Sequence, residues 1–358
     1  MPNLRLSLFG VPLTTVILTC AIGAVGALVA WGLRLPLPFL LGSLLAVAGI
    51  AASGARPFGR SPGMPQKLRM WFIPIIGVAI GGTFTPDLLA GVGGWWPSVL
   101  GLVVFIPVAH WCSYQLFLQV GGLSPQTSFY AAVPGGLIEA IAMGEDAGAD
   151  MQMLTMLQFL RLILSIVLVP LIFTILTGAA VGSASGAQLT NGAAGLSLSD
   201  VALLVAAGVV GYFVGNWLRL PGGAITGPII FSGLAHLAGL THAVPPGWMI
   251  ALTQLIVGVS LGVRFLGLPR GTFGKAFRLA LLNAVMTLCI GFLFALALHS
   301  AVGEKTGTVF LAFAPGGVAE MSLVALSLQV SVIYVTTHHV LRILLSVLIA
   351  QLFAHRVR

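Results

Sequence analysis

Charge is scarce in this sequence of 358 residues. Only 7% of the residues are charged, whereas a soluble domain carries about 25%. The mean hydropathy is +1.08, and 58% of the residues are hydrophobic. So few residues are charged, and the apolar residues come in runs near the length that a helix needs to span a bilayer. We therefore expect an all-α polytopic membrane protein whose main partner is lipid.

Cysteine and metal-binding motifs are also sparse. The three cysteines, Cys20, Cys112 and Cys289, lie far apart and form no Cys-x-x-Cys pair, so neither a disulfide framework nor a zinc site is predicted. The sequence has no Walker, Rossmann or paired Glu-x-x-His pattern. We therefore expect no metal, no cofactor, no catalytic residue and no enzyme activity. The net charge of +8 comes from Lys and Arg that stand singly or in short clusters between apolar stretches, so no nucleic-acid partner is predicted.

A repeated phrase stands out against this apolar background. Residues 132–139 read Ala-Val-Pro-Gly-Gly-Leu-Ile-Glu, and residues 313–320, 181 positions later, read Phe-Ala-Pro-Gly-Gly-Val-Ala-Glu. Residues 77–81 and 258–262 match at the same offset. We infer a duplication, with a first membrane repeat at 1–177, a flexible linker rich in Gly, Ala, Ser and Thr at 178–198, and a second membrane repeat at 199–358.

Basic residues predict how the repeats are oriented. The loop at 54–69 is basic but its counterpart at 238–247 has no Lys or Arg, whereas the segment at 264–278 is basic but its counterpart at 83–96 is not. The two basic clusters are Arg56, Arg60, Lys67 and Arg69, and Arg264, Arg270, Lys275 and Arg278. If both clusters are cytoplasmic, the repeats have opposite orientations in the membrane.

Inversion requires an odd number of crossings in each half, yet each half shows about six apolar segments. One segment per half must then enter and leave on one side. Assigning this role to the Pro-Gly-Gly segments, with both termini cytoplasmic, leaves only Arg34 and Lys305 outside and only Arg161 and Arg342 within the membrane. The predicted fold is thus two inverted-topology repeats with about five crossings each, plus a broken or re-entrant Pro-Gly-Gly segment in each half.

The Pro-Gly-Gly triplets are the first predicted binding residues: Pro134, Gly135 and Gly136, with Pro315, Gly316 and Gly317. Proline removes a main-chain donor and glycine is flexible, so the helix should break there. A broken main chain at membrane depth must be buried in protein or line a wet cavity. The alternative is a kink that only packs two helices closely.

Four charged residues follow the breaks. Glu139 and Glu320 fall in the first turn of a half-helix, where they could bind a proton or cation, cap the helix or join a buried ion pair. Arg161 and Arg342 lie mid-helix, where they could hold an anionic substrate or pair with the glutamates. Gln158 and His339 lie three residues before these arginines and could extend a polar path.

Together, the duplicated Pro-Gly-Gly…Glu phrase, the Leu-Pro-x-x-x-Leu-x-Gly pattern at 35–42 and the Gln158…Arg161 pair resemble the AbrB-type integral membrane proteins. This family carries a tandem duplication and is often labelled ammonia monooxygenase or AbrB family regulator. It is unrelated to the small DNA-binding proteins of the same name. The resemblance implies a bacterial inner-membrane protein, tied to regulation of gene expression, with the same Pro, Gly and Glu positions in its motif.

These features lead to one main functional hypothesis. We expect a secondary transporter of a small solute or ion that works by alternating access at the point where the two Pro-Gly-Gly segments meet. A membrane sensor that regulates gene expression is the alternative. A membrane oxygenase is disfavoured because no copper or iron ligand cluster is evident. A homo-oligomer stays open.

Overall fold

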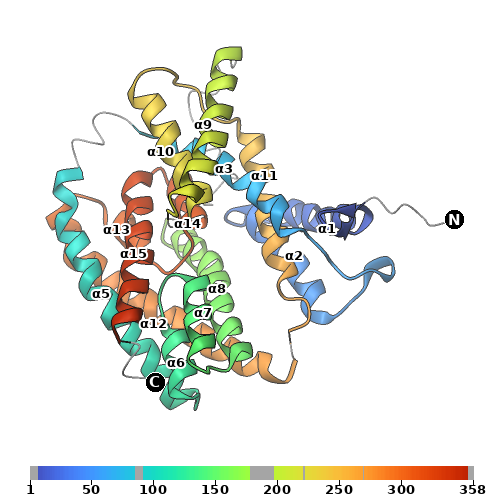
Figure 1. The fold of residues 1–358 in the computed structure, drawn as a ribbon, viewed down its shortest axis with the longest axis vertical. Coiled ribbons are helices and arrows are strands. Elements are labelled where there is room, and N and C mark those ends of the chain that lie inside the picture. Colours follow the sequence, from blue (N-terminus) through green and yellow to red (C-terminus); the bar gives the residue numbers. More distant parts are fainter. Residues whose placement is uncertain (1–6, 85–91, 178–196, 221, 269, 354–358) are drawn as a thin grey trace. The chain divides into compact units, whose positions relative to one another are not determined.

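The computed structural model describes residues 7–84, 92–177, 197–220, 222–268 and 270–353, which are almost entirely helical (Figure 1). Within them the strands are β1 (Ser7–Leu8) and β2 (Val11–Pro12), which form a short antiparallel hairpin. The predicted linker at 178–198 falls outside the described residues except for its last two positions. Ser197 caps the next helix, because its side chain accepts a hydrogen bond from the Asp200 main-chain N–H. Arg5, Asp87, Pro221, Arg356 and Arg358 also lie outside them.

The helices follow the predicted apolar segments. In the first half they are α1 (Leu13–Gly32), α2 (Pro38–Ser53), α3 (Gln66–Gly81), α5 (Trp96–Gln115), α6 (Pro125–Ala132), α7 (Leu137–Asp146) and α8 (Met151–Thr177), with short turns η1 (Pro57–Gly59), η2 (Val92–Trp95) and η3 (Leu116–Val120). In the second half they are α9 (Leu198–Trp217), α10 (Gly223–Leu237), α11 (Gly247–Val263), α12 (Arg270–Val302), α13 (Thr306–Phe313), α14 (Val318–Ser327) and α15 (Val332–Phe353).

Six helical stretches of the described chain are long and apolar enough to cross a bilayer. They are Leu13–Gly32, Gly93–Val120, Met151–Leu176, Leu198–Trp217, Gly271–Val302 and Val332–Phe353. The shorter helices α2, α10, α11 and α14 are also apolar. Large apolar side chains such as Val25 (62% exposed) and Phe213 (66%) point outward from α1 and α9, as expected of a surface that faces lipid. The prediction of an all-α polytopic membrane protein is confirmed.

The repeat seen in the sequence recurs in the element boundaries. Helices α6 and α13 begin and end 181 positions apart, and α7 and α14, α8 and α15, and α3 and α11 begin 181 positions apart. Helices α1 and α9 begin and end 185 positions apart, and the turns that follow these two helices are separated by the same number of positions. In these two turns, Arg34 and Arg219 both adopt a left-handed conformation with φ of 53°. The same local conformations are therefore built twice.

The chain divides into two compact units, each of which takes helices from both repeats. The first unit spans Met1–Pro86, Pro170–Leu268 and Leu326–Gln329, and so contains α1, α2, α3, α9, α10 and α11. The second unit spans Asp87–Val169, Pro269–Ala325 and Val330–Arg358, and so contains both Pro-Gly-Gly segments and the buried arginines Arg161 and Arg342. The compact units therefore differ from the division of the sequence into repeats.

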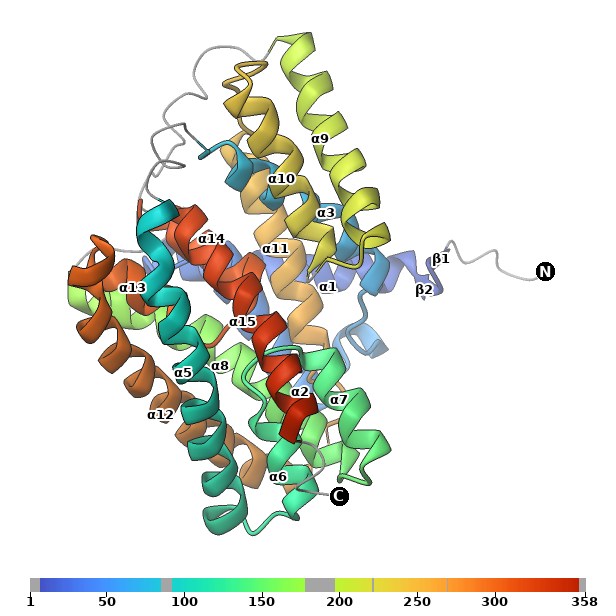
Figure 2. The same ribbon diagram turned by 60° about the vertical axis from the view of Figure 1, so that its left-hand side comes forward.

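Glycine allows the helices of the first unit to approach closely. Helices α1 and α2 meet at Gly26 and Gly42, where a Cβ atom built on Gly42 would lie 2.4 Å from the carbonyl oxygen of Gly26. Helices α9 and α10, which lie side by side in Figures 1 and 2, meet in the same way at Gly211 and Gly227. Main chains can come this close only where no side chain intervenes. The abundance of glycine thus serves helix packing.

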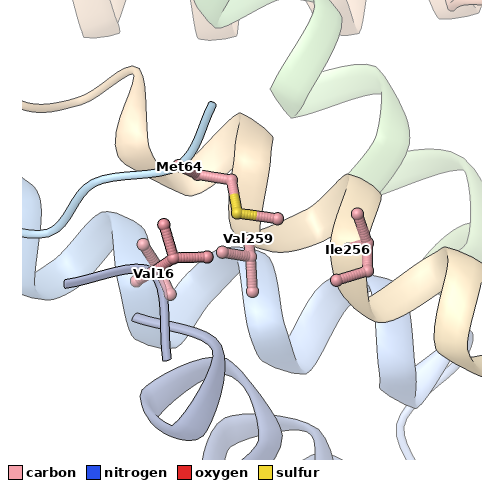
Figure 3. Packing of buried hydrophobic residues seen from close by; sticks show 5 residues of the cluster. Val16, Met64, Ile256 and Val259 are labelled. Atoms are coloured by element: carbon pink, nitrogen blue, oxygen red, sulfur yellow. The ribbon is translucent and has the colours of Figure 1, made fainter. Parts of the chain in front are cut away.

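An apolar core joins the two repeats within the first unit. Val16 of α1, Val47 of α2, Met64 and two residues of α11, Ile256 and Val259, are all buried and form one cluster. Figure 3 shows the Met64 side chain extending toward Val259, which lies between Val16 and Ile256 in this view. Because α11 comes from the second repeat, burial of this apolar surface ties the repeats together.

Equivalent helices run in opposite directions in this unit. Gln66, at the start of α3, accepts a hydrogen bond of 3.1 Å from Arg264, which follows the end of α11. At the other end, a Cβ atom on Gly82, just after α3, would lie 2.4 Å from a side-chain carbon of Val244, just before α11. Helices α3 and α11 are therefore antiparallel, as inverted repeats require.

The second unit repeats this arrangement. Helices α5 and α12 lie side by side and cross (Figure 2). Phe105 packs against Phe294 with ring centroids 5.4 Å apart. Cβ atoms built on Gly101 and Gly121 of the first repeat would approach Leu298 and Leu279. Since the residue number rises along α5 as it falls along α12, these equivalent helices are also antiparallel.

Candidate functional site

Both Pro-Gly-Gly segments break a helix as predicted. The first break, residues 133–136, separates α6 from α7, and the second break, residues 314–317, separates α13 from α14. Gly136 takes a left-handed conformation with φ of 66°, which a side chain would disfavour. Proline cannot donate a main-chain hydrogen bond. Pro134 and Pro315 lie within the breaks, after the helix that ends and before the helix that follows.

The first break packs closely against a helix of the other repeat. A Cβ atom on Gly135 would lie 3.1 Å from Ser346 Oγ and 3.3 Å from Ile343 Cα. A Cβ atom on Gly136 would lie 2.6 Å from a Val347 methyl group. These three residues belong to α15. Glycine at 135 and 136 therefore lets the break lie directly on the helix that carries Arg342.

The two arginines hold the carbonyl groups that the breaks leave without helical partners. Arg161 donates from Nη1 to the carbonyl of Val133, 28 residues before it, and Arg342 donates from Nη1 to the carbonyl of Ala314, also 28 residues before it. Arg342 also donates from Nη2 to the carbonyl of Gly316. Both side chains are buried, with exposed fractions of 8% and 1%. Each arginine thus satisfies acceptors that would otherwise be buried and unpaired.

Gln158 and His339 repeat this pattern one turn earlier. Gln158 Nε2 donates to the carbonyl of Tyr130 at 2.8 Å, and His339 Nε2 lies 3.0 Å from the carbonyl of Leu311 at the equivalent position. Both side chains have no measurable exposure. For His339 the bond requires the tautomer with a proton on Nε2. The sequence prediction of a shared polar face for Gln158 and Arg161, and for His339 and Arg342, agrees with these contacts.

The two glutamates occupy equivalent positions but different environments. Glu139 and Glu320 both lie in the first turn of their helices, α7 and α14. Each carboxylate folds back toward the last glycine of its own break, because Cβ atoms on Gly136 and Gly317 would lie 3.1 and 2.0 Å from the respective Oε2 atoms. Glu139 is exposed, whereas Glu320 is only 3% exposed. The two halves of the site therefore differ in access.

A small cavity lies between the breaks, inside the second unit. Pro134 and Arg161 of the first repeat and Pro315 and Arg342 of the second line the same cavity. Its volume is about 10 Å³, which is room for roughly one water molecule. The remaining lining residues are Phe105, Ala109, Ser113, Ala132, Asn283, Thr287 and Phe313. We call this space the arginine cavity.

Sequence reasoning missed the neutral polar residues of the arginine cavity. Asn283 and Thr287 lie one turn apart in the otherwise apolar middle of α12, and Ser113 lies in α5. Asn283 is 1% exposed, and its Oδ1 finds no hydrogen-bond partner within the described part of the chain. The sequence did carry a signal for Asn283, because an asparagine inside a predicted membrane helix is energetically costly and such residues are often functional.

A metal site receives no support from this arrangement. Within the described residues, no group of three or more His, Cys, Asp or Glu lies close enough to hold a metal ion. The lining of the arginine cavity includes two arginines and no carboxylate, thiolate or imidazole, so its charge would repel a metal cation.

Comparisons with known proteins agree with the resemblance noted in the sequence. The model of the family described as "Transition state regulatory protein AbrB" matches residues 50–358. The chain is 24% identical over 297 residues to "Putative regulator AbrB" of Escherichia coli (strain K12), covering 82% of each chain. It is 23% identical over 345 residues to "Uncharacterized protein YhjN" of Bacillus subtilis (strain 168), covering 91% of this chain and 88% of that protein. The chain, with its duplicated helix breaks and buried arginines, therefore belongs to the AbrB family.

Proposed function

We propose that this protein is a secondary transporter that moves a small solute or ion across the bacterial inner membrane by alternating access. One observation carries the proposal: the helix breaks of two oppositely directed repeats line a single buried cavity, the arginine cavity. Transporters built from inverted repeats place discontinuous helices around a central site in this way. In this proposal both termini face the cytoplasm, on the side of the two basic clusters.

The unequal glutamates support alternating access. In an inverted pair, the two repeats exchange conformations as the site opens to one side and then to the other. Glu139 is exposed while its counterpart Glu320 is buried. We infer that this structure represents one of two states, and that Glu139 becomes buried as Glu320 becomes exposed. Each glutamate would take up a proton or the coupling ion when its side is open.

Flux measurements on purified protein in liposomes test the proposal. A panel of small solutes is offered under an imposed proton gradient, and wild type is compared with the Glu139→Gln plus Glu320→Gln double variant. We expect gradient-dependent flux of at least one solute in wild type and its loss in the double variant. Glu145→Gln, at the exposed end of α7, is the matched control and should keep the flux. Equal flux in all three proteins, or none in wild type, would refute the transporter.

Regulation of gene expression is the second candidate function. It is favoured by the description of the matching family and by the name of the Escherichia coli relative. Transcript profiles of a deletion strain complemented with wild type or with the transport-dead double variant would separate the two functions. If the double variant restores the wild-type transcript profile, regulation does not need transport and a regulator is favoured. If only wild type restores it, the change in expression is a consequence of transport.

A membrane oxygenase is the third and weakest candidate. It would require copper or iron held by side chains of this protein. Metal analysis of the purified protein is the direct test, and stoichiometric copper or iron would revive this candidate.

A further inference from the structure

The arginine cavity holds more positive than negative charge. Among the described residues, the buried Lys, Arg, Asp or Glu side chains are those of Arg161, Arg342 and Glu320. Both guanidinium groups belong to side chains that line this one small cavity, so two like charges share it. Even if Glu320 is ionised, one buried positive charge is left over, and an uncompensated buried charge is costly.

Main-chain carbonyl groups offset only part of this charge. Arg161 donates to one carbonyl and Arg342 to two. A guanidinium group has five N–H donors, so each arginine keeps donors for a further acceptor. The Nε of Arg342 in particular is buried and has no hydrogen-bond partner among the described residues. The arginine cavity therefore combines excess positive charge with unused donors.

The remaining polar groups can orient a ligand without cancelling that charge. Asn283, Thr287 and Ser113 are neutral, buried and line the cavity. Thr287 donates its hydroxyl hydrogen to the carbonyl of Asn283 at 2.8 Å, within its own helix. Rotation of the Asn283 side-chain amide would turn its NH₂ group toward the space that its unpartnered Oδ1 now faces.

We propose that the arginine cavity binds a small anion, with a carboxylate held between Arg161 and Arg342 as the preferred head group. A planar carboxylate matches the fork of N–H donors on a guanidinium group better than a spherical ion does. Helices α7 and α14 begin three residues after the two prolines that line the cavity, and their positive ends add to the attraction. This inference rests on the proposed function only in taking the anion as the transported solute.

The arginine cavity, at about 10 Å³, is smaller than even a small carboxylate. One water molecule fills it, so formate or acetate can enter only if the two breaks move apart. An anion of few atoms requires the smallest such movement, so we expect a small ligand. Its entry would separate the break of one repeat from that of the other, which is the movement that alternating access requires.

Binding is tested on the full-length protein in nanodiscs by titration with sodium formate and sodium acetate. Acetamide, which has nearly the shape of acetate but no charge, is the neutral control, and sodium chloride tests a spherical anion. Ionic strength is held constant with the sodium salt of morpholinoethanesulfonic acid, a bulky sulfonate that has no carboxylate. We expect saturable binding of formate and acetate, weaker binding of chloride and none of acetamide. Equal binding of acetamide and acetate would overturn the anion site.

The variant Asn283→Asp gives a sharper test because it places a carboxylate in the arginine cavity with almost no change in volume. We expect it to fold, to gain thermal stability, and to lose acetate affinity by at least about tenfold. Asn216→Asp, at an exposed position of α9, is the matched control and should bind like wild type. Wild-type affinity in Asn283→Asp would refute the proposal without depending on arginine variants, which remove partners of buried carbonyls.

Failure of this inference and failure of the transporter proposal give different results. If acetate binds and Asn283→Asp abolishes binding while no solute crosses the liposome membrane, the anion site stands and the transporter is refuted. If a neutral or cationic solute is transported, Asn283→Asp leaves its flux unchanged and acetate binds no better than acetamide, the transporter stands and the anion site is refuted.

Discussion

Gln66 and Arg264 are joined by a hydrogen bond of 3.1 Å that brings the start of α3 to the end of its repeat counterpart, α11. Within the first compact unit, this contact places Arg264, the first residue of the basic cluster at 264–278, beside the start of α3, which follows the basic cluster at 56–69. The sequence predicts inverted repeats on the condition that both clusters lie on the cytoplasmic side of the membrane. The antiparallel packing of α3 and α11 is an independent observation that favours the inverted arrangement.

This relationship predicts the sidedness of three loops. In a background with Cys20, Cys112 and Cys289 replaced by alanine, single cysteines are introduced as Ala55→Cys, Leu266→Cys and His242→Cys, all at exposed positions. A membrane-impermeant maleimide should label His242→Cys in intact cells, and should label the other two only after permeabilisation. Labelling of Ala55→Cys and Leu266→Cys from opposite faces would contradict the inverted arrangement.

Close packing at glycine predicts a contrast within α2. A Cβ atom at Gly42 would lie 2.4 Å from the Gly26 carbonyl oxygen, whereas one at Gly49 meets nothing within 4 Å. We expect Gly42→Ala to destabilise the fold by about 1–3 kcal/mol, because main chain must move to admit the methyl group. Gly49→Ala should be neutral or stabilising by up to about 1 kcal/mol, because alanine favours helix.

The measurement is the fraction of monodisperse protein after heating in detergent. A shared loss of stability in both alanine variants would mean that general helix propensity, and not the contact between Gly26 and Gly42, decides the outcome.

The equivalence of Gln158 and His339 predicts a rescue. His339→Ala leaves the buried Leu311 carbonyl without its side-chain donor, which should cost about 1–3 kcal/mol of stability. His339→Gln supplies the amide donor that the first repeat uses at Gln158, so it should restore most of the loss. Thermal stability of the three proteins is the measurement. Equal loss in His339→Gln and His339→Ala would show that ring packing, rather than the hydrogen bond, matters at this position.

Glu304, in the loop between α12 and α13, predicts a pH dependence. Burial raises the pKa of its carboxyl group, while a hydrogen bond from Ser331 and the charge of Lys305 act in the opposite direction. Because the folded state favours the protonated form, the stability of wild type should fall as the pH rises from the usual carboxyl range, about 4.3, through the raised pKa. Glu304→Gln should lack this fall.

The comparison needed is the difference in melting temperature between wild type and Glu304→Gln from pH 4 to pH 7. Lys305→Gln is the companion variant: removing a nearby positive charge should make the fall steeper. A difference between wild type and Glu304→Gln that stays constant with pH would show that Glu304 is solvated in the folded protein.

Much of this structure was accessible from the sequence. Membrane spans, the duplication and the two helix breaks follow from local properties: apolar length, a recurring offset and the chemistry of Pro-Gly-Gly. The inverted orientation followed from basic residues, since charge crosses a bilayer at high cost. Predicting that Gln158 and Arg161 share a polar face needed only helical spacing.

Other features depended on contacts between distant segments. No local pattern indicates that Arg161 and Arg342 point into one cavity, that Asn283 joins them, or that Glu139 is exposed while Glu320 is buried. These relationships arise because helices from both repeats interleave in each compact unit, so the neighbours of a residue come from the other half of the chain. The sequence by itself determined where the helices break and which charges follow. Only the tertiary structure decided that the breaks enclose a shared, positively charged space, because side-chain packing is set by non-local burial.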